Sequence, residues 1–288
     1  MNTAHSWRVG LVQCNSSRVI EDNFAPLERA IRQAATDGAD FIATPENCVM
    51  MEPNRDRALA TARTAADHPA LPFFAGLARE TGAMILAGSI GIKLEAETGN
   101  DSPPKLANRS YVFAGGSGEI IAEYNKIHLF DVTLGSGEVY RESALYEPGT
   151  EAVLVKSSRA NIGLTICYDL RFAALYRLLA KMGAEVLCVP AAFTAITGRA
   201  HWHSLLRARA IETGCFVLAP AQVGVHAEGR ETYGHSLVVS PWGEVLADGG
   251  EAPGVTVIDL DLSKVAEARS KIPALLHDRE FALKITNH

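Results

Sequence analysis

Cysteine is scarce in this sequence, and no two cysteines lie close together. The 288 residues contain five cysteines and no CxxC pair, and the five are Cys14, Cys48, Cys167, Cys188 and Cys215. An odd number at wide spacing disfavours both a disulfide framework and a structural zinc site. The sequence therefore predicts a protein of a reducing compartment, and we expect it to be cytoplasmic.

The sequence also lacks an excess of positive charge, a long apolar run and a leader segment. Its 27 lysines and arginines are outnumbered by 33 aspartates and glutamates, which gives a net charge of −6. This balance disfavours a nucleic-acid partner, because phosphate binding needs a basic face. No stretch approaches the roughly 18 apolar residues of a membrane-spanning helix, and the start, MNTAHSWRVGLVQCNSS, has no apolar segment of the secretory type. We therefore expect no nucleic acid, no membrane and no secretion.

What the sequence does contain is an alternation of strand-like and helix-like segments. Short apolar runs such as 7–14 and 40–44 are typical of strands, and many are too continuous for a sheet with one wet face. Helical apolar spacing is found at 19–35, 72–81, 170–182, 201–213 and from 263 up to Pro273. No linker-like stretch interrupts the pattern. The sequence therefore predicts a single α/β domain over residues 1–288, with mixed sheets covered on both faces.

One internal similarity suggests that this domain has two similar α-β halves. Residues 37–46 (DGADFIATPE) and 182–191 (MGAEVLCVPA) both end a helix on glycine, enter a short strand and stop at proline. The two glycines, Gly38 and Gly183, are 145 positions apart, which is about half of the chain. Two unrelated segments that each end a helix on glycine before a short strand would give the same pattern by chance. Similar halves and chance similarity therefore both stay open as explanations.

Three side chains with reactive groups follow strand-like segments. Glu46 follows FIATP, Lys126 follows EIIAEYN, and Cys167 follows NIGLTI. Active residues of α/β folds gather at the carboxyl ends of strands, and lone charges beside apolar segments are costly. A carboxylate, an ammonium and a thiol brought together would form a base, an electrostatic clamp and a nucleophile.

Each of these residues also has an ordinary structural interpretation. A single cysteine is more often a small buried apolar residue than a nucleophile, Glu46 could be a satisfied turn residue, and Lys126 could be a solvated surface charge. The position of Cys167 between a strand and a helix start favours a stabilised thiolate. Spacing alone does not bring the three residues together.

Three motifs in the same order resemble the catalytic motifs of the nitrilase superfamily of carbon–nitrogen hydrolases. They are TPEN (44–47), YNKIHLFD (124–131) and ICYDLRF (166–172). Further segments resemble the deaminated-glutathione amidase branch, close to the ω-amidases; they are FTAITGRAHWHSLLRARAIET (193–213), AQVGVH (221–226) and RETYGHSLVVSPWGEVLA (230–247). The resemblance covers nearly the whole chain. It implies a four-layer α-β-β-α sandwich with mixed sheets.

The resemblance also implies roles for individual residues. Glu46, Lys126 and Cys167 would form the catalytic triad. A second glutamate, which would hold the lysine, falls on Glu142, although the nearby Glu138 competes for this assignment. The backbone N–H of Tyr168 and the ammonium of Lys126 would bind the oxyanion.

Substrate-binding positions in the related amidases fall on three further residues, Arg171, Phe193 and Thr197. Arg171 is four residues after Cys167, about one helical turn on, and its guanidinium could bind a substrate carboxylate in a bidentate manner. An ion pair of Arg171 with Asp169 or with another carboxylate is nearly as good an explanation. The histidines do not predict a metal site, because His201 and His203 are two apart, there is no HExxH motif, and His128 and His235 fit structural hydrogen bonding.

The expected function is hydrolysis of the terminal carboxamide of a small α-keto acid or a deaminated-glutathione-like substrate, to a carboxylate and ammonia, through a cysteine thioester. The resemblance implies neither a cofactor nor a metal. A carbamoylase or a nitrilase would share the triad, and a catalytically silent binding protein on the same fold is a further alternative. The resemblance also implies a homo-oligomer, a dimer or a dimer of dimers, in which residues 263–288 pack on a partner subunit.

Overall fold

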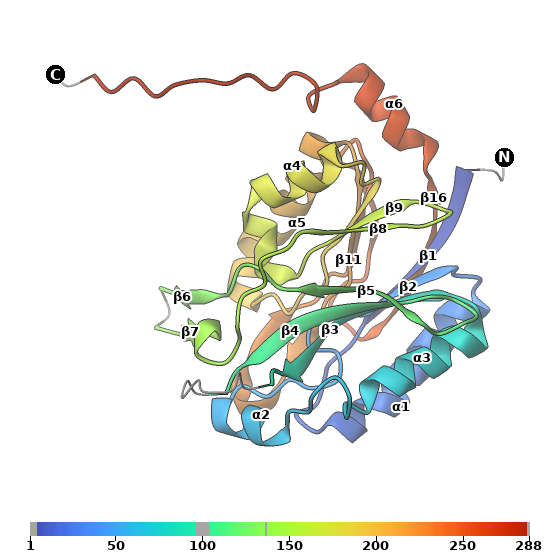
Figure 1. Ribbon diagram of the computed structural model, residues 1–288, viewed down its shortest axis with the longest axis vertical. Coiled ribbons are helices and arrows are strands. Elements are labelled where there is room, and N and C mark those ends of the chain that lie inside the picture. Colours follow the sequence, from blue (N-terminus) through green and yellow to red (C-terminus); the bar gives the residue numbers. More distant parts are fainter. Residues whose placement is uncertain (1–4, 96–103, 136, 287–288) are drawn as a thin grey trace.

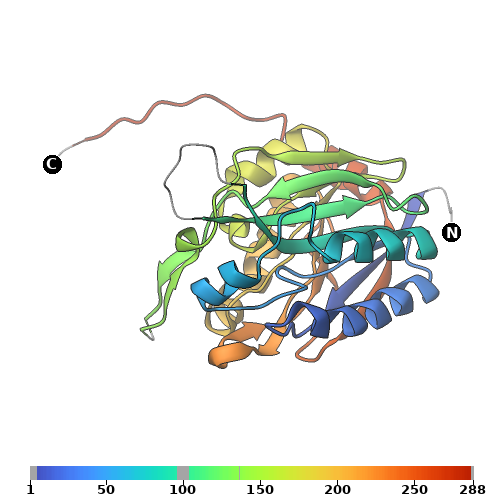
Figure 2. The same cartoon turned by 60° about the horizontal axis from the view of Figure 1, so that its bottom comes forward.

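The computed structural model describes residues 5–95, 104–135 and 137–286, and two six-stranded sheets dominate it (Figures 1 and 2). The first sheet has the spatial order β16 (Gly254–Asp261), β1 (Ser6–Gln13), β2 (Phe41–Ala43), β3 (Met84–Lys93), β4 (Leu106–Phe113) and β5 (Ile120–Asn125). The second has the order β15 (Val245–Asp248), β14 (Leu237–Val239), β11 (Phe216–Ala219), β10 (Val186–Cys188), β9 (Asn161–Leu164) and β8 (Val153–Lys156). Both sheets mix parallel and antiparallel neighbours.

Helices cover the outer face of each sheet. α1 (Ile20–Thr36) and α3 (Ala70–Thr81) contact the first sheet, and α4 (Ala173–Lys181) and α5 (Ala195–Thr213) contact the second (Figure 1). The remaining elements are α2 (Arg55–Thr61), α6 (Ser263–Lys271), the hairpins β6 (Asp131–Thr133) with β7 (Val139–Arg141) and β12 (Val223–Val225) with β13 (Glu231–Tyr233), and the 3-10 helices η2 (Glu142–Ala144), η3 (Cys167–Arg171) and η4 (Ala227–Gly229). The predicted four-layer α-β-β-α sandwich is therefore confirmed.

The continuous apolar runs of the sequence are explained by burial of both faces of each sheet. In β2, Phe41 and Ala43 belong to the core between the two sheets, whereas Ile42 belongs to the core beneath α1 and α3. A strand whose side chains point alternately into two cores has no solvent-exposed face. Removal of this apolar surface from water is the main force that holds the four layers together.

The internal similarity of the sequence corresponds to equivalent places in the two sheets. β2 lies between two parallel neighbours in the first sheet, and β10 does so in the second. Gly38 and Gly183 precede these strands with φ of +89° and +101°, a backbone conformation that glycine adopts without steric cost. The prediction of two similar α-β halves is confirmed, and the loops after β2 and β10 reach the same region of the molecule.

Two helices begin at places other than those predicted. The segment predicted as a helix over 170–182 begins as the 3-10 helix η3 and continues as α4 only from Ala173. α5 begins six residues before the predicted start at His201, because Gly198 is tolerated inside the helix. A Cβ atom at Gly198 would lie 2.3 Å from the Tyr233 ring, so close packing against β13 requires the glycine.

The C-terminal segment extends away from the rest of the chain (Figure 1). α6 ends before Pro273, as predicted, and beyond it Phe281, Leu283 and Ile285 are 95%, 86% and 76% exposed. Residues 287–288 of the predicted partner-binding segment 263–288 lie outside the described residues, and its packing on a partner stays a prediction. Over the ranges given above, no helix has the length and apolar character needed to cross a bilayer.

Candidate active site

The three predicted catalytic side chains meet where strands of both sheets end. Lys126 follows β5 and its Nζ lies 2.8 Å from Oε1 of Glu46, which follows β2. Cys167 follows β9 of the opposite sheet, and its thiol lies near enough to Glu46 and Lys126 for the charges of both to shift its pKa. All three side chains belong to buried residues, with Glu46 and Lys126 each 2% exposed and Cys167 8% exposed. The structure therefore brings together a carboxylate, an ammonium and a thiol that are far apart in the sequence.

The carboxylate of Glu46 is fixed by groups from both halves of the chain. Its Oε2 accepts a hydrogen bond of 2.8 Å from the Ala192 N–H, in the loop after β10. Its Oε1 accepts one of 2.9 Å from the Asn108 side chain on β4. The Gln222 amide holds the Glu46 backbone carbonyl at 3.0 Å. Glu46 is thus oriented rigidly, with one oxygen toward Lys126.

The second glutamate at the lysine is Glu142. Both of its carboxylate oxygens lie 2.8 Å from Nζ of Lys126, and Oε2 also accepts a hydrogen bond from the Phe130 N–H. Glu138 is exposed and accepts a hydrogen bond from the Tyr140 hydroxyl instead. Of the two candidates left open by the sequence, Glu142 is the one that contacts Lys126.

Burial and charge together set the protonation of this cluster. Burial disfavours the ammonium of Lys126, but Glu142 and Glu46 outweigh it and hold its pKa well above the usual range. Burial also disfavours the ionised Glu46, yet the charge and hydrogen bond of Lys126 lower the pKa of its carboxyl. Burial, and next the Glu46 charge, raise the pKa of the Cys167 thiol. The resting site therefore holds a neutral thiol beside an ionised carboxylate and a charged lysine.

The backbone around Cys167 forms a sharp turn. Cys167 has φ of +47°, and its N–H donates to the Pro190 carbonyl at 2.9 Å, so this N–H is occupied. Tyr168 is the second residue of η3, and an N–H at that place has no acceptor inside its own helix. A left-handed φ at a residue other than glycine is strained. The turn presents the sulfur with a neighbouring free N–H, which is the arrangement that an oxyanion site needs.

Asp169 stabilises the turn at Cys167 by accepting hydrogen bonds, a role that the sequence did not suggest. The buried Asp169 carboxylate accepts hydrogen bonds from the Tyr124 hydroxyl at 2.6 Å and the Ile166 N–H at 2.8 Å. It also contacts the backbone N–H and the ring of His128. The alternative ion pair between Asp169 and Arg171 is therefore wrong. A signal was present, because Tyr124 and His128 stand two residues on either side of Lys126.

A cavity of about 270 Å³ opens in front of the three side chains. Glu46, Lys126 and Cys167 line it together with the predicted residues Tyr168, Phe193 and Thr197. Further aromatic and cationic residues line it as well, namely Phe130, Tyr140, Tyr146, Arg55, Arg141 and Arg230. The cavity thus combines aromatic walls with positive charge, which suits a small ligand that carries a carboxylate.

Arg171 is not among the residues that line this cavity, contrary to the expectation for it. Its guanidinium lies over the rings of Tyr168 and Phe193, at 5.8 and 5.3 Å, and 3.3 Å from Nδ1 of His201. The expectation assumed 3.6 residues per turn, whereas η3 has the 3-10 geometry of 3.0 residues per turn. Four residues then rotate the side chain well past the direction of Cys167.

Arg230 occupies the cavity wall that Arg171 was expected to line. Its Nη2 donates to the Ala192 carbonyl at 3.2 Å, and its guanidinium lies 5.7 Å from the centre of the Tyr140 ring. Its buried Nε has no hydrogen-bond partner among the described residues. Arg230 begins one of the segments that carry the family resemblance, but nothing in the sequence singled it out from the other arginines.

Comparisons with known proteins agree with this geometry. The carbon–nitrogen hydrolase family profile matches residues 8–270. The protein called deaminated glutathione amidase of Synechocystis sp. is 40% identical over 273 residues, 92% of this chain and 96% of that protein. The crystal structure of the C. elegans NitFhit protein has a TM-score of 0.86 and 34% identity, and covers 96% of this chain and 66% of its own. Saccharomyces cerevisiae Nit3, a member of branch 10 of the nitrilase superfamily, has a TM-score of 0.81 and 26% identity, with 93% and 95% covered.

Proposed function

The chain belongs to the carbon–nitrogen hydrolase family and is a hydrolase of amide carbon–nitrogen bonds, and we propose that it cleaves the amide of a small α-keto acid of the deaminated-glutathione type through a thioester on Cys167. The observation that carries this proposal is that Glu46, Lys126 and Cys167 line one cavity, with Oε1 of Glu46 2.8 Å from Nζ of Lys126.

The first half of the proposed reaction is attack by the sulfur. Glu46 takes the thiol proton as Sγ of Cys167 bonds to the amide carbon, so a neutral thiol suffices at rest. Negative charge then develops on the former carbonyl oxygen. The Tyr168 N–H and the Lys126 ammonium stabilise it, and one such donor is typically worth about 3 kcal/mol of the barrier. Glu46 returns the proton to the departing nitrogen, and the carbon–nitrogen bond breaks.

The second half is hydrolysis of the thioester. Glu46 removes a proton from water as the water oxygen attacks the acyl carbon, and it returns this proton to the sulfur as the carbon–sulfur bond breaks. The product is the free carboxylic acid, and the thiol and the carboxylate are restored. Glu142 contacts Lys126, the Asn108 side chain and the Phe130 N–H, and it gains or loses no proton in this scheme, so it acts as a positioning residue.

The substrate class is proposed from the relatives and from the cavity. The Synechocystis relative carries the name deaminated glutathione amidase, and an α-keto acid brings a carboxylate to a cavity lined by Arg230, Arg55 and Arg141. We propose that Arg230 binds this carboxylate, since its Nε lacks a partner. A terminal carboxamide would release ammonia, whereas deaminated glutathione would release cysteinylglycine, because that dipeptide is the amine side of its γ-amide.

One experiment tests the proposal and its alternatives together. The protein is mixed with deaminated glutathione, α-keto acid carboxamides, carbamoyl amino acids and nitriles, and intact mass, ammonia and free amine are measured. The proposal expects an acyl adduct on Cys167 and turnover of the keto-acid amides. A Cys167→Ser variant is the control and should form no thioester. Turnover of nitriles or carbamoyl compounds alone would favour a nitrilase or carbamoylase, and no adduct with any compound would favour a silent binding protein.

We also propose the setting in which this activity works. The five cysteines are free, which supports the cytoplasm, and the negative charge supports a small-molecule substrate rather than nucleic acid. A homodimer is supported by exposed apolar residues on α4, just after α4 and on α5, where Leu178, Met182 and Ile211 are 50%, 64% and 55% exposed. The exposed C-terminal segment would complete that interface.

A further inference from the structure

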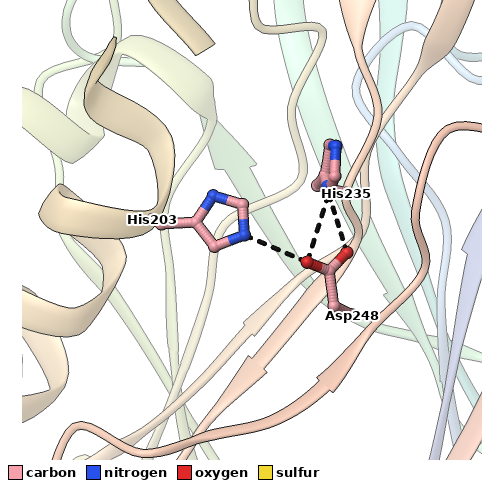
Figure 3. A group of neighbouring side chains, drawn as sticks. All are labelled: His203, His235 and Asp248. Atoms are coloured by element: carbon pink, nitrogen blue, oxygen red, sulfur yellow. Dashed lines mark hydrogen bonds and ion pairs between the residues drawn. The ribbon is translucent and has the colours of Figure 1, made fainter. Parts of the chain in front are cut away.

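A second cluster of polar side chains lies outside the cavity, between α5 and the β14–β15 hairpin (Figure 3). Nε2 of His203 on α5 lies 3.0 Å from Oδ2 of Asp248, at the end of β15. Nδ1 of His235, just before β14, lies 2.9 and 3.1 Å from the two oxygens of the same carboxylate. The donor atoms of all three residues lie within 4.8 Å of one another.

The surrounding structure holds each of these side chains in place. The His235 backbone has φ of +54°, and it is fixed by the Trp202 indole, which donates to its carbonyl, and by its own N–H, which donates to Gly250. The Gly250 N–H donates to Oδ1 of Asp248 at 2.9 Å. The His235 ring stacks on Tyr233 with centres 4.4 Å apart. A chance contact at the surface would need neither a strained histidine backbone nor a carboxylate that is already oriented. These two features therefore favour a binding site.

We propose that His203, His235 and Asp248 form a binding site for a divalent transition-metal ion of the zinc type. Two imidazole nitrogens and one carboxylate oxygen are a ligand set that such ions use with an open position. A tetrahedral ion with bonds of about 2.1 Å separates its ligand atoms by about 3.4 Å, so the observed nitrogen-to-oxygen distances of 2.9–3.1 Å need only a small expansion. The cluster is 18–35% exposed at its side chains, which leaves room for water as the fourth ligand.

Binding of the ion changes the tautomer of each imidazole, with no net release of a proton. In the hydrogen-bonded cluster, Nε2 of His203 and Nδ1 of His235 must each carry a proton in order to donate to Asp248. The ion takes the place of these two protons, and each neutral ring then carries its proton on the other nitrogen. For His235 this is Nε2, which lies 3.7 Å from Glu251. Glu251 would thereby become an outer partner of the site.

The position of the site couples it to the wall of the active-site cavity. His203 is on the same helix as Thr197, and its neighbour Trp202 packs on Phe193 with ring centres 5.0 Å apart. A bound ion would tie the middle of α5 to the β14–β15 hairpin. We therefore expect it to raise the thermal stability of the chain and to stiffen the cavity wall formed by Phe193 and Thr197.

Zinc binding to the untagged full chain tests this proposal. Titration calorimetry is done in a Cys167→Ser background, because the active-site thiol would itself bind zinc. We expect one Zn²⁺ per chain, with an affinity that falls at least about tenfold in His203→Gln and in Asp248→Asn. His201→Gln is the matched control, since His201 is exposed on the same helix outside the cluster, and it should bind as the background protein does. Visible absorption of bound Co²⁺ reports whether imidazole ligands are present.

The outcomes separate this site from the proposed amidase. Stoichiometric binding that is unchanged in His203→Gln and Asp248→Asn would overturn the proposal, as would the absence of binding in the background protein. Circular dichroism melts of each variant without metal show whether a loss of binding reflects misfolding, and the melting temperature of a folded variant should no longer rise with Zn²⁺. None of these results depends on turnover of an amide.

Discussion

At the scale of single residues, the unusual feature of the site is a buried base beside a thiol that is not ionised. Burial and the Glu46 charge raise the pKa of Cys167, whereas Lys126 lowers the pKa of Glu46 despite burial. The proposed reaction would therefore depend on an ionised Glu46 and not on a thiolate formed in advance. This distinction has a consequence for the dependence of the rate on pH.

An ordinary thiol has a pKa of about 8.5. We expect kcat/KM of the unchanged protein to show no inflection near that pH. In Glu46→Gln the rate should fall by about 10²–10⁴ at neutral pH and then rise with pH, because the thiol must now ionise before attack. Steady-state rates across pH measure both profiles. Glu138→Gln, an exposed carboxylate, should match the unchanged protein. A Glu46→Gln profile as flat as the original would contradict the role of Glu46 as the base.

The lysine gives a prediction about stability. Lys126→Met leaves the buried Glu46 and the partly buried Glu142 without their cation, and loss of one partner of a buried pair costs about 3–5 kcal/mol. The lowered pKa of Glu46 means that its stabilising contribution is present above its unfolded pKa and is lost as pH falls through its folded pKa. Without Lys126 that folded pKa rises, so the deficit of the variant should shrink between about pH 7 and pH 5.

Urea unfolding at several pH values measures this deficit. The double variant Lys126→Met with Glu46→Gln is the control, because it removes one of the two stranded charges and should recover part of the lost stability at neutral pH. A deficit that stays constant with pH would mean that the loss comes from packing and not from charge.

Two arginines provide the third prediction at this scale. Arg230→Met should raise KM for amides that carry a carboxylate by roughly tenfold or more, because a charge-assisted hydrogen bond is lost, and should leave neutral amides little changed. Arg171→Met is matched in chemistry but lies outside the cavity lining, and we expect a smaller effect. Steady-state kinetics with both substrate kinds decides. If Arg171→Met raised KM more than Arg230→Met did, Arg171 would be the residue that binds the substrate carboxylate, as expected from the sequence.

These residues also mark what a sequence can and cannot predict. Glu46, Lys126, Cys167 and Tyr168 follow strand ends within recognisable motifs, so their positions were predictable. Arg171 was misplaced because a sequence does not distinguish a 3-10 turn from an α-helical one when both begin with the same residues. Arg230 was missed because its importance comes from a cavity that other elements complete.

At the scale of elements, Asp169 joins η3 to the segment that carries Lys126. Its carboxylate accepts hydrogen bonds from Tyr124 on β5 and from backbone on both sides. We expect Asp169→Asn to lower the free energy of unfolding by about 2–3 kcal/mol, because charge-assisted hydrogen bonds in the interior are lost. It should also lower kcat, since the turn that presents Cys167 loosens.

The matched control for Asp169 is again Glu138, whose carboxylate accepts a hydrogen bond from Tyr140 at the surface. Glu138→Gln should change stability by no more than about 0.5 kcal/mol. Chemical denaturation and steady-state rates are compared for the two variants. If Asp169→Asn unfolds like the original and keeps its kcat, the support of the catalytic turn lies elsewhere.

The helices and strands were largely predictable from periodicity, but which strands lie next to each other in a sheet was not. The strands before Glu46 and Cys167 were evident from apolar runs that stop at proline or at a charged residue. The spatial order of the two sheets depends on contacts between residues far apart in the chain, such as the pairing of β1 with β16. The family resemblance supplied the four layers in advance but not this order, which no local pattern encodes.

At the scale of the whole molecule, the exposed C-terminal segment is the part of the chain that we expect to contact a second subunit. Phe281, Leu283 and Ile285 are almost fully exposed, and exposed apolar side chains in a row are costly unless they are covered. Among the described residues, the segment is held near its start, where Asp278 pairs with Arg177 and Lys181 of α4 and the Ala274 carbonyl accepts a hydrogen bond from Arg177. Its free part could bury its apolar residues on a second copy of the chain.

We therefore expect removal of residues 279–288 to weaken or abolish the proposed dimer while leaving the fold intact, because Asp278 and its ion pairs remain. Light scattering of the full and shortened chains at several concentrations measures this change. Phe281→Ser combined with Leu283→Ser, in the full chain, separates loss of apolar contact from loss of length and should weaken the dimer as well. Because Glu46, Lys126 and Cys167 all come from one chain, a monomeric variant should still form the acyl adduct. An unchanged molecular mass after truncation would place the interface elsewhere, with the exposed apolar residues of α4 and α5 as the next surface to change.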